Sequence, residues 1–130
     1  MSFASSPNRP TVMIVDDSAS MRALIASLVA GIAGEIIECD DGSVAIRQFR
    51  ERRPDLVLMD IGMRGTDGLT ATRAIRLNDA SAQIVIVTDY AGDPLRRAAR
   101  DAGAIGFFQK DQLAELPGWL VAFTTGFPAS

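Results

Sequence analysis

The chain has 130 residues, of which 48% are hydrophobic and 22% are charged, so it is long and apolar enough for one globular core and is not a disordered chain. It has no histidine and one cysteine, which excludes serine–histidine and cysteine–histidine catalysis, histidine–zinc sites and a disulfide framework. Its net charge of −3 gives no support for direct nucleic-acid binding, and no apolar run approaches the roughly 18 residues of a membrane span, so we expect a cytoplasmic protein without membrane insertion.

The first half of the chain alternates short apolar runs with helical patterns. Residues 1–10 are polar and are expected to form a flexible segment, and the apolar run 12–15 predicts a buried strand. Behind a cap at Ser18, apolar residues recur at helical spacing as far as residue 32. A weaker strand candidate, 36–39, ends at Cys39, which we interpret as a buried thiol, and a second helix follows Asp41-Gly42. This helix carries four arginines, whose spacing indicates a solvated outer face: Arg47, Arg50, Arg52 and Arg53.

The second half repeats the alternation. The runs 56–59 and 84–87 predict buried strands, and a third helix is expected to begin near Asp67-Gly68. The fourth helix opens with Asp93 as its cap and Pro94 in the first helical position, and it stops at Gly103. A weaker strand at 106–108 precedes a fifth helix within 112–124, in which Pro117 either makes a kink or starts the main part.

Strand and helix thus alternate five times. Parallel neighbours need crossover helices, and right-handed crossovers place helices on both faces of one sheet. We therefore predict an α/β fold: a five-stranded parallel sheet, doubly wound as (βα)5, over residues 11–125. A short tail at 126–130 would follow, with no output domain.

Polar side chains follow the strong strands at their carboxyl ends, where ligands bind in open α/β sheets. Asp16 and Asp17 follow the first run, Asp60 the third strand, Thr88 the fourth, and Lys110 the fifth. Lys110 is the only lysine among thirteen basic residues, which suggests that this position needs a compact ammonium group. Three neighbouring carboxylates require a cation, and a site with oxygen ligands only favours Mg²⁺. A carboxylate that faces Mg²⁺ and a lysine can attack phosphorus and form an aspartyl phosphate.

These residues resemble the receiver domain of two-component response regulators, in its single-domain, chemotaxis-regulator-like form. The resemblance covers about residues 11–125 and rests on these motifs: Val-Asp16-Asp17-Ser18, Leu-Met-Asp60-Ile-Gly-Met63, Thr66-Asp67-Gly68, Thr88, and Gly103-Ala104 before Phe107 and Lys110. It implies a flavodoxin-like fold and a signalling phosphoacceptor that is not an enzyme acting on other substrates.

The resemblance also implies a role for each matching position. Asp60 would accept a phosphoryl group from a histidine kinase or a phosphotransfer protein. Asp17 would bind Mg²⁺ directly and Asp16 mainly through water, and the backbone carbonyl of Gly62 would be a further ligand.

Three more positions would read the phosphate. Lys110 would pair with the phosphoryl oxygens, Thr88 would donate a hydrogen bond to one of them, and Phe107 would turn inward when the threonine moves. The output would be a contact with a downstream protein or with a second copy of the chain.

Several positions depart from the family pattern. Asp89 stands where the family has a small residue, so it either turns to solvent or repels the phosphoryl group. Arg64 and Asp111 each replace a proline, and without a proline after the lysine a cis peptide bond there is not expected. The resemblance places Gly62 and Tyr90 at the two positions that tune phosphate lifetime in the family, and this pair predicts slow hydrolysis.

Two other readings compete with a phosphorylated switch. A phosphohydrolase with an aspartate nucleophile would need a second acid at the position of Gly62. A degenerate receiver that is never phosphorylated would act as a docking module, and Asp89 and Arg64 keep that reading open.

Overall fold

A computed structural model describes residues 9–124, and within them one sheet of five parallel strands runs in the order β2-β1-β3-β4-β5. The strands are β1 (Thr11–Val15), β2 (Glu35–Cys39), β3 (Leu56–Met59), β4 (Ile84–Thr88) and β5 (Gly106–Gln109). All five predicted strands are present, including the two weaker candidates. The order reverses direction between β1 and β3, and such a switch point opens a crevice at the carboxyl ends of the strands.

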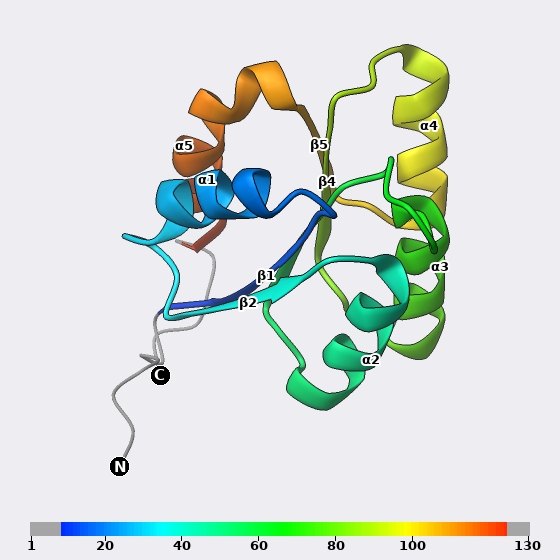
Figure 1. The fold of residues 1–130 in the computed structure, drawn as a ribbon, viewed down its shortest axis with the longest axis horizontal. Helices are drawn as coiled ribbons and strands as arrows, with labels where there is room; N and C mark the ends of the chain where they lie inside the picture. The colour runs from blue at the N-terminus through cyan, green and yellow to red at the C-terminus, as the bar shows by residue number, and fades with distance from the viewer. Residues whose placement is uncertain (1–8, 125–130) are drawn as a thin grey trace.

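Helices cover both faces of the sheet, as predicted (Figure 1). α1 (Ala19–Val29) and α5 (Leu116–Thr124) lie on one face, while α2 (Gly42–Arg52), α3 (Gly68–Asn78) and α4 (Asp93–Ala102) lie on the other. A 3-10 helix, η1 (Lys110–Glu115), connects β5 to α5. None of the helices in residues 9–124 combines the length and apolar character that a membrane span requires.

The core consists of two apolar layers, one on each face of the sheet. Along β1, Met13 and Val15 pack with the layer under α2 to α4, whereas Val12 and Ile14 pack with the layer under α1 and α5. Every residue of β3 and β4 is buried, which explains why these strands show no polar alternation in the sequence. Cys39 belongs to the first layer and is buried, as predicted.

Three helices begin where the sequence predicted, and each has a side-chain cap, of which the cap at Ser18 was itself predicted. The Ser18 hydroxyl accepts a hydrogen bond from the Met21 N–H, and Asp41 and Asp67 cap α2 and α3 in the same way. The four arginines that the pattern placed on the outer face of the second helix, at positions 47, 50, 52 and 53, are all exposed.

The predicted cap of the fourth helix is wrong. Gly92, with a φ of 113°, is the cap residue, and Asp93 and Pro94 are the first two residues of α4. The chain enters this helix through a backbone conformation with positive φ that only glycine adopts easily, so no side chain caps it. Gly103 ends α4 with a φ of 109°, as predicted. Pro117 is the second residue of α5, where a missing N–H is harmless, so it starts the main part of that helix.

The boundaries of the domain lie close to the ends of the described chain. Pro10 is buried and its carbonyl accepts a hydrogen bond of 2.8 Å from the Gly34 N–H, and Arg9 donates to the Ala30 carbonyl at 3.3 Å. The rest of the expected N-terminal segment, residues 1–8, and the expected tail, residues 126–130, lie outside the described residues.

Candidate functional site

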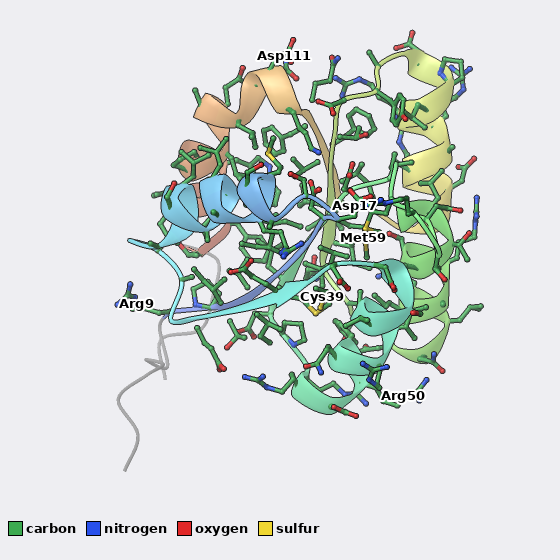
Figure 2. All side chains as sticks on the ribbon, in the orientation of Figure 1. Arg9, Asp17, Cys39, Arg50, Met59 and Asp111 are labelled. Carbon is green, nitrogen blue, oxygen red and sulfur yellow. The ribbon has the colours of Figure 1, made fainter. Side chains whose placement is uncertain are left out.

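The polar residues predicted at the strand ends do meet at one edge of the sheet. Val15 of β1 pairs in register with Met59 of β3, which pairs with Ile86 of β4. The residues that follow these strands therefore emerge side by side. Figure 2 shows Asp17 and Met59 at this edge, between the two layers of helices.

Lys110 is the positive centre of the site. Its Nζ lies 2.8 Å from Asp16 Oδ2, 3.5 Å from Asp60 Oδ2 and 3.9 Å from Asp89 Oδ2. The lysine side chain is only 10% exposed. Burial alone would lower the pKa of Lys110, but the hydrogen bond to Asp16 and the charge on Asp60 outweigh it and raise the pKa above its ordinary value. The ammonium group therefore stays charged at neutral pH.

Three carboxylates form a cluster that fits a divalent cation. One oxygen from each of Asp16, Asp17 and Asp60 lies within 4.8 Å of the other two. Asp16 and Asp60 are buried, and burial raises the pKa of Asp60 although Lys110 opposes this. Three carboxylates against one ammonium leave two negative charges in excess, so a doubly charged ion would balance the site. The donors are oxygens only, which suits Mg²⁺.

The two buried carboxylates, Asp16 and Asp60, differ in how closely their donors approach. Asp16 Oδ1 accepts a 2.9 Å hydrogen bond from the Ser18 N–H, and its other oxygen contacts Lys110. The nearest backbone donor to Asp60 is the Gly62 N–H, at 3.5 Å from Oδ1. Asp60 therefore has the freer oxygen of these two buried acids.

Gly68 fixes the backbone next to Asp60. A Cβ at position 68 would lie 1.9 Å from the Asp60 carbonyl oxygen, so only glycine allows α3 to begin against this residue. The backbone at Gly68 needs no positive φ; the requirement is space. This close approach explains why Asp67-Gly68 follows the acceptor loop.

Gly62 and Tyr90 are in direct contact. A Cβ on Gly62 would lie 2.6 Å from Tyr90 Cε2, so the tyrosine ring occupies the space above the glycine. The Tyr90 side chain is 56% exposed and comes from the loop after β4. The sequence identified both positions separately, but it gave no sign that one side chain lies over the other.

The loop after β4 places one polar side chain inside and one outside. Thr88 is fully buried and its Oγ1 accepts a 3.3 Å hydrogen bond from the Tyr90 N–H. Asp89 is 78% exposed, so of the two orientations expected for it, the one toward solvent is the one observed. Its Oδ2 nevertheless lies 3.9 Å from Lys110 Nζ.

Phe107 lies away from the acidic cluster on β5, partly buried against the core layer under α4. The Arg96 guanidinium carbon lies 4.6 Å from the centre of its ring, a cation–π contact. Both residues line a groove of about 360 Å³ between α4 and β5. Sequence reasoning found Phe107 but missed Arg96, whose position on a helix rich in arginine carries no distinguishing signal.

Two further arginines that the sequence did not identify as site residues contact the acidic loops. Arg22 donates to the Asp16 carbonyl at 2.7 Å and pairs with Glu38 at 3.0 Å, which ties the loop after β1 to α1 and β2. Arg64 contacts Asp17 from the loop after β3.

Within residues 9–124 no cis peptide bond occurs, as predicted for the bond after Lys110.

Comparison with known proteins agrees with this geometry. Residues 12–117 match the family model described as the response regulator receiver domain. The chemotaxis protein CheY of Bacillus subtilis is 36% identical over 109 residues, which cover 80% of this chain and 91% of that protein. Several longer response regulators also match, and the chain spans about 50% of their length.

Solved structures show the same fold. A two-component response regulator of the LuxR family from Aurantimonas sp. SI85-9A1 superposes with a TM-score of 0.83 at 34% identity, over 94% of this chain and 89% of that one. A chain of the CheX-CheY-BeF3-Mg+2 complex from Borrelia burgdorferi superposes with a TM-score of 0.79 at 25% identity, over 87% of this chain and 88% of that one.

Proposed function

Because this chain belongs to the family of response regulator receiver domains of two-component systems, we propose that it is a signalling switch that accepts a phosphoryl group on Asp60 with the help of Mg²⁺. The observation that carries the proposal is the placement of Asp60 Oδ2 3.5 Å from Lys110 Nζ within a cluster of three carboxylates. The donor would be a phosphohistidine on a histidine kinase or on a phosphotransfer protein.

Asp60 is a better acceptor than its buried neighbour Asp16 for a physical reason. Its neighbour Asp16 is engaged at both oxygens, by the Ser18 N–H and by Lys110. Burial raises the pKa of Asp60, which makes its carboxylate a better nucleophile than an exposed one once it is ionised. Lys110 keeps that carboxylate charged while it attacks.

The transfer step exchanges one bond for another. An Asp60 oxygen forms a bond to phosphorus as the bond between phosphorus and the donor nitrogen breaks, and the departing imidazole nitrogen takes up a proton. Lys110 compensates the charge on the phosphoryl oxygens. Mg²⁺, when held by Asp17, Asp60 and the Gly62 carbonyl and through water by Asp16, supplies further positive charge against these oxygens. The Mg²⁺ of the Borrelia CheY complex supports this choice of ion.

Thr88 would respond to the phosphoryl group, and the resulting structural change would reach the surface at Phe107. A phosphoryl group brings about −1.5 to −2 charge next to Lys110, which favours movement of the Thr88 hydroxyl toward it. Phe107 has no hydroxyl, so its signal is one of ring packing. Its cation–π contact with Arg96 connects β5 to α4, the surface that would meet a downstream protein or a second copy of the chain.

The tyrosine over Gly62 supports a long-lived phosphate. The ring lies over Gly62, two residues after the acceptor, where it would limit the approach of water, and glycine offers water no polar side chain. Asp89 acts in a different way, because its charge next to Lys110 slows the arrival of the phosphoryl group.

Labelling with acetyl phosphate tests the proposal. The wild-type protein should gain one phosphoryl group in MgCl₂ and none in EDTA, and Asp60→Asn should gain none in either. Intact mass spectrometry measures the product. A wild-type protein that is not labelled by acetyl phosphate or by a phosphotransfer protein would refute phosphorylation and leave the docking-module reading, which Asp89 and Arg64 keep open.

A further inference from the structure

Arg64 makes a backbone hydrogen bond and a side-chain ion pair to the same oxygen of Asp17. The Arg64 backbone N–H lies 3.2 Å from Asp17 Oδ2, and the guanidinium Nε lies 3.5 Å from the same oxygen. The two residues are 47 positions apart in the sequence and come from the loops after β1 and β3. A proline at position 64 would supply neither donor.

The pair is not a buried structural ion pair. The Arg64 side chain is 91% exposed and the Asp17 side chain is 26% exposed. Exposed ion pairs contribute little to folding, so the guanidinium is not needed to hold the two loops together. The guanidinium does place a positive charge 3.5 Å from Asp17 Oδ2, where it opposes the negative charge of that carboxylate.

The surroundings of Arg64 are acidic. Asp17, Asp40 and Asp41 line a cavity of about 300 Å³ together with Arg64 and Gly65. The Asp41 side chain already accepts the capping hydrogen bonds of α2. Lys110 pairs with Asp16 and Asp60 on the other side of the cluster. Among the residues that line this cavity, Arg64 is the one cation.

We propose that Arg64 is a built-in counter-ion for Asp17, which a divalent cation must displace, so that Arg64 weakens Mg²⁺ binding and makes it sensitive to ionic strength. The inference rests on the proposed function, because it takes Asp17 as a metal ligand. The two donors act differently. The backbone N–H orients the carboxylate and leaves its other oxygen free, whereas the guanidinium carries the charge that opposes the ion.

The expected effect follows from the exposure of the pair. Removing the charge should tighten Mg²⁺ binding by about two- to fivefold, because exposed ion pairs of this kind are worth up to about 1 kcal/mol. Salt screens exposed charges, so the gain should shrink as ionic strength rises. A purely structural role for Arg64 would not produce this salt dependence.

The test compares charge variants of the full chain in MgCl₂ titrations. Arg64→Gln removes the charge and keeps the backbone donor, and Arg64→Lys keeps the charge. Arg50→Gln is the matched control, because Arg50 is an exposed arginine of α2 that lies far from Asp17 (Figure 2). The thermal midpoint is measured against MgCl₂ at constant ionic strength, and its rise gives the dissociation constant.

Tighter binding by Arg64→Gln, with Arg64→Lys and Arg50→Gln close to wild type, is the expected result. Equal binding by Arg64→Gln and wild type at low salt overturns the inference, and so does an equal gain in Arg50→Gln, which would show an effect of net charge alone. Asp17→Asn separates the two proposals: if its response to MgCl₂ equals that of wild type, the metal site itself is wrong, whatever Arg64 does.

Discussion

Replacing Gly68 with alanine tests whether the start of α3 holds the backbone of the acceptor in place. An added Cβ would lie 1.9 Å from the Asp60 carbonyl oxygen, 2.7 Å from its carbon and 2.9 Å from the Ile61 Cα. All three atoms belong to the backbone, so none of them can move aside as the end of a side chain does. Either α3 or the loop after β3 has to shift.

The size of the effect follows from this overlap. The approach is about 1.1 Å shorter than the 3.0 Å limit of real Cβ contacts. Overpacking that forces backbone shifts costs about 1–3 kcal/mol, and we expect Gly68→Ala to lie at or above the upper end. Without the clash, alanine in place of a helical glycine would stabilise the protein by up to about 1 kcal/mol.

Gly118 offers the matched control. It lies in the first turn of α5, and a Cβ there would meet nothing within 4 Å. Gly118→Ala should therefore stabilise the protein slightly, whereas Gly68→Ala should lower the free energy of unfolding by about 3 kcal/mol. Urea unfolding followed by circular dichroism measures both, and acetyl phosphate labelling shows whether the shift reaches Asp60. Equal stability of the two variants, with normal labelling, would refute the reasoning.

Four further predictions concern single side chains. Asp89→Ala should speed labelling by up to about fivefold, because an exposed charge 3.9 Å from Lys110 is removed; unchanged rates of both labelling and decay would contradict this. Tyr90→Ala should shorten the lifetime of the phosphate, measured by decay after removal of the donor, and a wild-type half-life of only seconds would show that the ring gives no protection. Asp67→Ala should cost about 1 kcal/mol at pH 7 in urea unfolding. Hydrogen bonds from Thr70 hold the pKa of Asp67 below its ordinary value of 3.8, so this stabilisation is present above that pH and is lost as the pH falls through the lowered pKa; a cost that does not shrink in acid would be inconsistent with a capping role. Burial raises the pKa of the Cys39 thiol to about 11, so thiol reagents should modify it at pH 8 only after unfolding, and rapid modification of the native protein would disprove its burial.

Local sequence patterns were enough to predict the architecture. The runs in β1, β3 and β4 lack polar alternation because both faces of these strands are covered, and that leaves a direct trace in the sequence. Caps such as Ser18 and Asp67 act on N–H groups two or three residues away, so they too can be predicted from neighbours in the chain. The cap of α4 was predicted wrongly because Asp93-Pro94 fits two adjacent registers, and the positive φ of Gly92 decided between them.

The sequence by itself determined which groups gather at the edge of the sheet, because parallel strands bring their carboxyl ends together whatever the loops do. Asp16, Asp60 and Lys110 follow from that rule. Only the tertiary structure decided that Tyr90 lies over Gly62, that Arg96 lies against Phe107, and that Arg64 contacts Asp17. These contacts join side chains from separate loops and helices, where no repeating pattern records a partner, and their geometry depends on how the whole chain packs.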